Sequence, residues 1–134
     1  KTRQPHRVPL TDRMEEVLQE ARTLSPGSQL IFPNVRTGKP LSYNTLLHVL
    51  QKRVGSTATV HGFRSSFKDW VSETTNFSNE VSEMALSHKI PNKVEAAYRR
   101  GDLLGKRREL MQAWSDYVCG TTGQVVSVKF GSIG

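Results

Sequence analysis

The sequence predicts a mainly α-helical domain with a small β component. Three observations support this prediction. Apolar residues recur at three- and four-residue spacing in several segments, which is the period of a helix face. Capping residues, Pro and Gly separate those segments. Runs of β type occur only at the two ends of the chain, and its 134 residues suffice for one domain with a hydrophobic core.

The first half of the chain is expected to contain one strand and two helices. Residues 3–9 are compatible with an N-terminal strand that leads into a turn. Asp12 and Glu15 are placed as a capping box for the first helix, and Ser42 is placed to cap the second. Residues 25–40 are rich in Pro and Gly and are expected to form a loop. The expected buried faces are Met14, Val17, Leu18 and Ala21, then Tyr43, Leu46, Leu47, Leu50 and Val54.

The second half is expected to be helical up to Gly120, a favourable C-cap. Pro91 interrupts it, and Asn92 is placed to cap the helix that follows. The tail, residues 121–134, is a lone strand that needs a partner strand from the N-terminal segment or from another molecule. The expected helix faces are Phe63, Phe67, Trp70, Val71 and Thr74, then Val81, Met84, Ala85 and His88, then Leu103, Leu110, Met111, Trp114 and Val118.

Composition narrows the class of protein. Hydrophobic residues make up 36% of the chain, and no apolar run approaches the length of a membrane span. The single cysteine, Cys119, excludes an internal disulfide and a zinc site built from cysteines. The formal net charge is +7, from 19 basic and 12 acidic residues, which is typical of a nucleic-acid-binding domain.

Positive charge is concentrated in the segment "RRGDLLGKRR", residues 99–108. One interpretation is that these side chains contact DNA phosphates, in which case binding would weaken steeply with salt. The alternative is a solvated helix face with no ligand. The basic residues concerned are Arg99, Arg100, Lys106, Arg107 and Arg108.

The candidates for chemistry are weak when each is taken alone. His61 and Arg64 stand three residues apart at the start of an expected helix, where a His is often a cap or a surface group. His88 lies on an apolar stripe, which also suits a buried, hydrogen-bonded histidine. Tyr98 also suits a buried structural tyrosine, and Lys1 is a terminal residue.

Their order along the chain is more specific than any one of them. That order is Lys1, then His61 and Arg64 in "HGFR", then His88 in "LSHK", then Tyr98 in "EAAYRR". Over residues 1–119 this series resembles the tyrosine recombinase family, in particular the prophage-type integrases. The opening "KTRQPHRVPL" also resembles the lysine-bearing β-hairpin of that family.

The chemistry of such a site is consistent with these residue types. DNA strand cleavage without a metal needs a nucleophile that can later leave, and a tyrosine phenol meets this need. A phenol with an ordinary pKa of about 10 also needs a base and nearby positive charge. The resemblance implies that Tyr98 forms a 3′-phosphotyrosyl link, that His61 assists proton transfer and that Lys1 protonates the departing 5′ oxygen. It also implies that Arg64 clamps the phosphate oxygens and that His88 hydrogen-bonds the phosphate.

The resemblance also implies a fold and a domain division. Residues 1–120 are expected to be the C-terminal part of a tyrosine recombinase catalytic domain, with a helical fold and an N-terminal hairpin strand, and residues 121–134 its tail strand. The family has a further arginine upstream of the lysine hairpin that has no counterpart here, so the chain alone is expected to be catalytically impaired. Ser87 stands where many relatives have Gly.

The function implied is site-specific DNA recombination in the bacterial cytoplasm during prophage integration and excision, without metal, ATP or another cofactor. The implied partners are double-stranded DNA attachment sites, further copies of the protein in a tetramer, and host DNA-bending and excision proteins. Type IB topoisomerases share the chemistry but not this short spacing. Two other classes compete: a non-catalytic DNA-binding module or decayed prophage remnant, and a helical domain that binds a protein partner.

Overall fold

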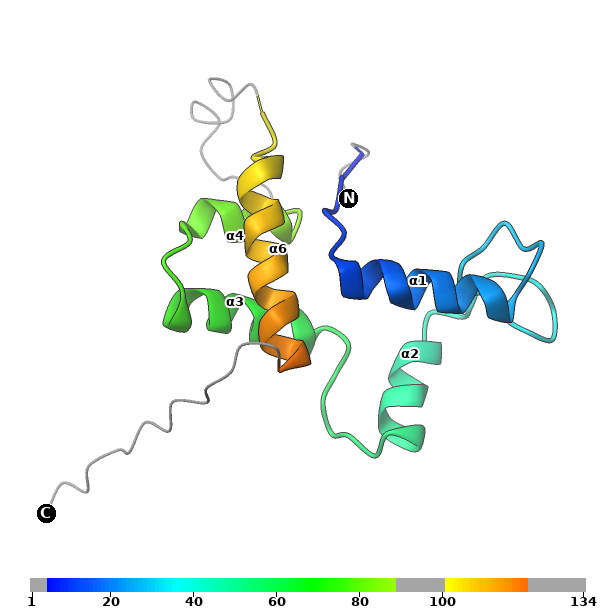
Figure 1. Ribbon diagram of the computed structural model, residues 1–134. Helices are drawn as coiled ribbons and strands as arrows, with labels where there is room; N and C mark the ends of the chain where they lie inside the picture. Colours follow the sequence, from blue (N-terminus) through cyan, green and yellow to red (C-terminus); the bar gives the residue numbers. More distant parts are fainter. Residues whose placement is uncertain (1–4, 89–100, 121–134) are drawn as a thin grey trace, which may run out of the picture.

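The computed structural model describes residues 5–88 and 101–120, and these are mainly helical (Figure 1). The prediction of a mainly α-helical protein is therefore confirmed. The helical elements are α1 (Asp12–Leu24), α2 (Thr45–His48), the π-helix η1 (Val49–Arg53), α3 (Gly62–Thr74), α4 (Asn79–Ala85) and α6 (Leu104–Cys119).

The hydrophobic core lies where α3, α4 and α6 meet. Leu110 of α6 is fully buried there, and Val71 of α3 and Val81 of α4 are each only 2% exposed. The side chains that complete this core come from these three helices and from the residues that flank them. They are Phe67, Trp70, Phe77, Ala85, Leu86, Leu103, Met111 and Trp114.

Aromatic rings join α3 to the C-terminal half of α6. The Phe67 ring meets the Trp114 ring edge-on, with centroids 5.3 Å apart and planes at 86°. Trp70 lies 5.0 Å from Trp114 and 5.4 Å from Tyr117, centroid to centroid. Edge-to-face and offset contacts of this kind add to the energy of area burial. They fix the direction of α3, which is the helix that carries Arg64.

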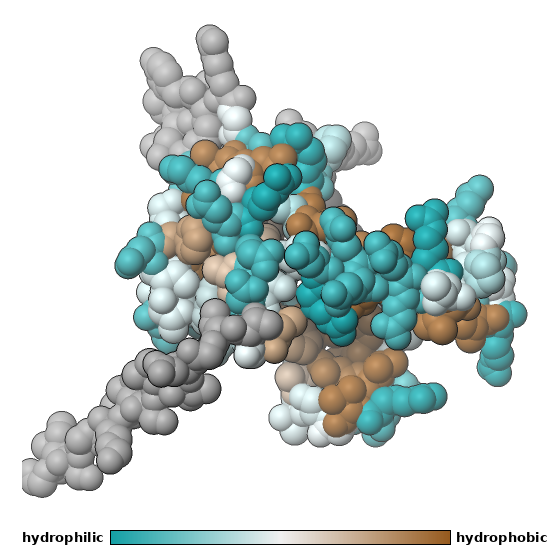
Figure 2. All heavy atoms as spheres, in the orientation of Figure 1, coloured by the Kyte–Doolittle hydropathy of each residue, from teal (hydrophilic) through white to brown (hydrophobic). Residues whose placement is uncertain are grey.

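The helices α1 and α2 extend away from this core (Figure 1). One link back is the side chain of Thr11, whose hydroxyl donates to the Ser115 hydroxyl of α6 at 3.2 Å. Ala21 is the buried apolar residue of α1. Exposed apolar side chains gather over this part of the chain and are seen as brown patches in Figure 2. They include Leu10, Val17, Leu24, Leu46, Val49 and Val54.

The predicted β component is not found in the described residues. Residues 5–10 form no strand, and the β feature that the structure shows within 5–88 and 101–120 is an isolated antiparallel bridge between Pro33 and Pro40. Pro5 and Pro9 lack the backbone N–H that a ladder needs, which explains why the segment does not pair. Residues 1–4 and the tail at 121–134 lie outside the described residues, as does the helix expected after Asn92.

Two of the expected helix starts need correction. The cap of α1 is Thr11, whose hydroxyl accepts a hydrogen bond from the Met14 amide at 3.4 Å, so the cap is one residue earlier than Asp12. The second helix begins at Thr45 with Asn44 as its N-cap. The Ser42 hydroxyl pairs with the Thr45 hydroxyl at 2.9 Å and does not cap a backbone amide. Gly120 is the C-cap of α6 with φ of 68°, as predicted.

Several residues of the expected buried faces are exposed. Tyr43 is 99% exposed and Val54 67%, because nothing among the described residues covers that face of α2 and η1. Phe63 at the start of α3 and Val118 near the end of α6 are also exposed. No helix in the described ranges is both long and apolar enough to cross a membrane.

Candidate functional site

Arg64 is presented from the first turn of α3. The hydroxyl of Thr59 accepts a hydrogen bond from the Gly62 amide at 3.0 Å and so satisfies one of the free N–H groups at the start of the helix. A Cβ at position 62 would lie 3.2 Å from that hydroxyl, so glycine suits this tight start. Phe67 and Val71, further along the same face of α3, are buried in the core. Arg64 lies before them at the start of the helix, where its side chain is exposed.

His88 is placed by the C-terminal turn of α4. The His88 amide donates to the Glu83 carbonyl at 2.9 Å and the Ser87 amide to the Met84 carbonyl at 3.1 Å. This pair of bonds is a Schellman motif, which needs a residue with left-handed backbone geometry at the turn. Ser87 supplies it with φ of 57°. The chain consequently folds back and brings His88 over the last turn of α4.

Arg64 and His88 meet between α3 and α4. Nη2 of Arg64 lies 2.9 Å from Nε2 of His88, and the same guanidinium nitrogen donates to the Leu86 carbonyl. The two residues are 24 positions apart in sequence. Among the predicted catalytic residues that lie within the described ranges, Arg64 and His88 are the pair that the structure brings into contact. Both side chains remain open to solvent.

An ion pair supports the imidazole from its other side. Nδ1 of His88 lies 2.6 Å from one carboxylate oxygen of Glu83, and Nζ of Lys68 lies 2.6 Å from the other. Lys68 also donates to the Ser82 hydroxyl at 2.6 Å. The Lys68 hydrogen bond, followed by that of His88, lowers the pKa of the Glu83 carboxyl below its ordinary value. Glu83 is thus held as a carboxylate between two donors.

This arrangement suits the binding of an oxyanion. A guanidinium offers five N–H donors in a planar fork, and only part of that capacity is used by His88 and Leu86. An exposed fork beside an imidazole matches the geometry of a phosphate with several free oxygens. No group of three His, Cys, Asp or Glu side chains in the described part of the chain is arranged to hold a metal ion.

Of the other predicted catalytic residues, the structure describes His61. His61 directly precedes α3, one turn before Arg64, and its carbonyl accepts the Arg64 amide at 3.0 Å. Its side chain is exposed. Tyr98 and Lys1 lie outside the described residues. The same holds for Arg99 and Arg100, two members of the predicted basic cluster.

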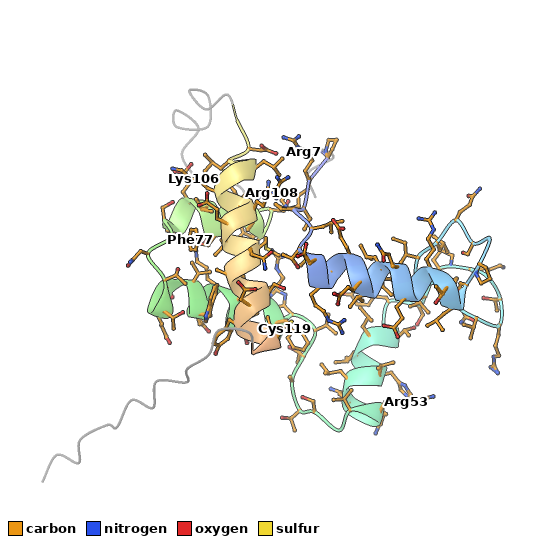
Figure 3. The ribbon with its side chains drawn as sticks, viewed as in Figure 1. Arg7, Arg53, Phe77, Lys106, Arg108 and Cys119 are labelled. Atoms are coloured by element: carbon orange, nitrogen blue, oxygen red, sulfur yellow. The ribbon has the colours of Figure 1, made fainter. Side chains whose placement is uncertain are left out.

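The remaining basic cluster residues fall on the first turns of α6. Lys106 and Arg108 are exposed, and Figure 3 shows both beside this end of the helix. Successive residues of a helix point about 100° apart, so these two side chains flank the one between them. That residue, Arg107, faces the interior and is only 2% exposed.

The expectation that Arg107 contacts DNA is corrected by this burial. Its Nη2 donates to the Arg7 carbonyl and to Nε2 of His6, the latter at 3.3 Å, and its Nη1 donates to the Asp102 carbonyl at 3.3 Å. Burial lowers the pKa of the guanidinium, an effect opposed by Asp102. Arg107 is occupied in holding the N-terminal segment to α6. It therefore has no exposed surface with which to bind a phosphate.

Comparison with known proteins relates the chain to the phage and prophage integrases. It is 36% identical over 120 residues to prophage integrase IntZ of Escherichia coli strain K12, a match that covers 88% of this chain and 29% of IntZ. It is 33% identical over 136 residues to prophage integrase IntA of the same strain, covering 99% of the chain and 33% of IntA. The integrase of Enterobacteria phage P4 is 32% identical over 123 residues, with 88% and 28% covered.

The chain thus spans about a third or less of the length of the curated relatives it matches. No protein-family model matches it. No solved structure matches it either.

Two residues of the site were not predicted from sequence. Lys68 follows Arg64 by four residues on α3, which is the spacing that places side chains on one helix face. Glu83 precedes His88 by five residues, a spacing that does not place two side chains on the same face of a helix. The proximity of Glu83 and His88 depends on the left-handed turn at Ser87. A serine does not indicate such a turn in the way that a glycine does.

Proposed function

We propose that the chain carries the phosphate-binding part of an integrase active site that cleaves and rejoins DNA through a covalent 3′-phosphotyrosine. The observation that carries the proposal is the contact of Arg64 with His88 at 2.9 Å, with both side chains exposed, one on α3 and the other just after α4. The similarity to relatives named prophage and phage integrases supports it. The reaction proposed is site-specific recombination between DNA attachment sites.

The proposed roles divide between binding and bond making. Arg64 holds the non-bridging oxygens of the scissile phosphate, and His88 donates a hydrogen bond to one of them. Tyr98 attacks the phosphorus, His61 assists removal of the phenolic proton, and Lys1 protonates the departing 5′ oxygen. Guanidinium groups that stabilise phosphoryl transfer contribute about 10³ to 10⁵ in rate in other enzymes.

A trapped covalent adduct tests the nucleophile and the clamp. In the experiment, this chain replaces the segment of prophage integrase IntZ that it matches, and the hybrid is mixed with a nicked suicide DNA substrate. We expect a phosphotyrosyl adduct, which Tyr98→Phe abolishes and Arg64→Ala reduces by about 10³ or more. Arg53→Ala is the matched control, since Arg53 is exposed on η1, away from α3 in Figure 3, and should leave the adduct yield unchanged.

An adduct that persists in Tyr98→Phe would refute the assignment of the nucleophile. Absence of an adduct from the hybrid, while intact IntZ forms one and this chain alone still retains DNA, would favour the alternative of a non-catalytic DNA-binding module.

The DNA-binding surface proposed here consists of Lys106 and Arg108 with Arg99 and Arg100. Each phosphate contact contributes about 0.9 to the slope of log K against log salt on duplex DNA. We expect the double variant Lys106→Ala with Arg108→Ala to reduce that slope by about 2 for this chain. An unchanged slope would show that these two side chains are merely solvated.

A further inference from the structure

The hydrogen bonds around His88 determine where its proton lies. An arginine has donors and no acceptor, so Nε2 of His88 must accept from Nη2 of Arg64 at 2.9 Å. An ionised carboxylate accepts and does not donate, so Nδ1 must carry the proton that bonds Glu83 at 2.6 Å. Glu83 is kept ionised by Lys68 on its second oxygen. These contacts therefore fit an imidazole with its proton on Nδ1 and a free lone pair on Nε2.

A bound phosphate requires Nε2 to donate a hydrogen bond, whereas Nε2 accepts one from Arg64 in the anion-free chain. Phosphate oxygens accept hydrogen bonds, so a phosphate bound beside Arg64 needs a proton on Nε2. Nδ1 cannot give up its own proton at low cost, because its lone pair would then face the Glu83 carboxylate. The imidazole can satisfy both neighbours only by gaining a second proton and becoming an imidazolium.

We propose that Glu83 is a positioning residue that holds His88 by Nδ1–H, and that oxyanion binding at Arg64 is coupled to uptake of one proton at His88 Nε2. This inference rests on the proposed function, because a DNA phosphate is the natural oxyanion. In the step, the Arg64–His88 hydrogen bond breaks and the guanidinium turns to the phosphate oxygens. Nε2 takes a proton from solvent and donates it in a hydrogen bond to the phosphate, while Glu83 remains a carboxylate.

The charges around His88 favour this coupling once the anion is bound. Within the described residues, the charged groups in contact with His88 or with its carboxylate partner are Arg64 and Lys68 from α3 and Glu83 from α4. In the anion-free chain the two cations oppose a further positive charge and Glu83 favours it. A bound oxyanion adds at least one negative charge and offsets the Arg64 guanidinium. The arriving phosphate thus supplies the charge that an imidazolium needs.

The test is ¹⁵N NMR of His88 in this chain, with inorganic sulfate as the probe and sodium chloride at equal ionic strength as its control. Sulfate does not titrate near neutral pH, so any proton gained belongs to the protein. Without sulfate at pH 7.5, we expect a protonated Nδ1 and an unprotonated Nε2. With sulfate, both nitrogens should be protonated, and the apparent Kd should rise by up to about tenfold per pH unit, which is the limit for one linked proton.

Glu83→Gln preserves the shape of the side chain and an oxygen acceptor but removes the negative charge. We expect it to retain the Nδ1 proton and to lose the sulfate-dependent protonation of Nε2. Glu109→Gln, at an exposed position on α6, is the matched control and should behave as the original chain. The measurement on the unmodified chain remains decisive if a variant fails to fold.

Two outcomes would overturn the proposal. One is a transfer of the proton from Nδ1 to Nε2 on sulfate addition, with no net gain. The other is a sulfate affinity that does not change between pH 6 and pH 8. The anion-free protonation state is read without DNA or catalysis. A missing phosphotyrosyl adduct would therefore refute the proposed function without deciding the state of His88.

Discussion

Glu83 is the residue that connects both sides of the candidate site. Its two carboxylate oxygens accept from Lys68 of α3 and from His88 after α4, each at 2.6 Å. The hydrogen bond from Lys68, then that from His88, lowers the pKa of Glu83 in the folded chain. Such a shift makes the stability of the fold depend on pH, because the unfolded chain binds the proton more readily.

The direction in which stability changes with pH can be predicted. Since the folded pKa of Glu83 lies below the unfolded value of about 4.3, its contribution is fully present above that value and is lost as pH falls through the folded pKa. We expect the difference in free energy of unfolding between the original chain and Glu83→Gln to be constant above about pH 5.5 and to shrink towards pH 3. Urea denaturation at several pH values measures it. A difference that grows on acidification would contradict the prediction.

The position of a helix in the fold depends on the turns at its ends as well as on its buried face. The turn after α4 requires left-handed geometry at Ser87, with φ of 57°. For a residue with a Cβ, this geometry costs roughly 1–2 kcal/mol. Glycine adopts it freely but loses about 0.5–1 kcal/mol through the greater freedom of the unfolded chain.

The net effect predicts that Ser87→Gly stabilises the chain by up to about 1 kcal/mol. The matched control is Ser72→Gly in the last turn of α3, where the backbone is helical and the same change should destabilise by about 0.5 kcal/mol. Chemical denaturation of both variants checks the prediction. Equal destabilisation in the two would show that the strain at Ser87 is absent.

Helix faces were predicted well where a partner helix exists, and helix ends less well. Phe67, Val71, Val81 and Leu110 form the core as their spacing predicted. The cap of α1 was assigned to Asp12, but Thr11 takes this place because its hydroxyl reaches the Met14 amide. Sequence spacing cannot distinguish two adjacent capping residues, since the choice depends on the backbone geometry of the preceding residues.

For the site, sequence order indicated Arg64 and His88, and the structure brings them into contact. The support from Glu83 and Lys68 was not predictable, because it depends on how α3 crosses α4 and on a left-handed serine. Arg107 was predicted to lie on a basic surface, yet it faces inward. A run of like charges does not tell which member falls on the buried stripe of a helix.

Apolar side chains are buried unevenly across the described parts of the molecule. The core of α3, α4 and α6 contains Leu110, which is fully buried, whereas α1, α2 and η1 present many exposed apolar side chains. Regions with few buried apolar contacts open locally at a lower free-energy cost than the core. The two parts should therefore differ in the protection of their backbone amides.

Hydrogen exchange gives the third prediction. We expect the slowest amides in α3 and α6, and faster exchange in α1, α2 and η1. Leu110→Ala should cost about 2–5 kcal/mol and lower the protection of α3, α4 and α6, with little change in α1. Exchange measured by mass spectrometry on peptides from the native chain tests both statements. Protection in α1 as high as in α6 would refute the division.

The buried guanidinium of Arg107 also has a consequence for how this segment can be transplanted. It binds the Arg7 carbonyl a hundred positions earlier in the chain, and so closes a long loop through the N-terminal segment and the start of α6. Lysine cannot replace it, because one ammonium group does not reach the three carbonyl and imidazole acceptors that the planar fork spans. An α6 transplanted into this chain therefore keeps the tie to the N-terminal segment only if it carries an arginine at position 107, because the acceptors at Arg7 and Asp102 are backbone carbonyls that any residue supplies.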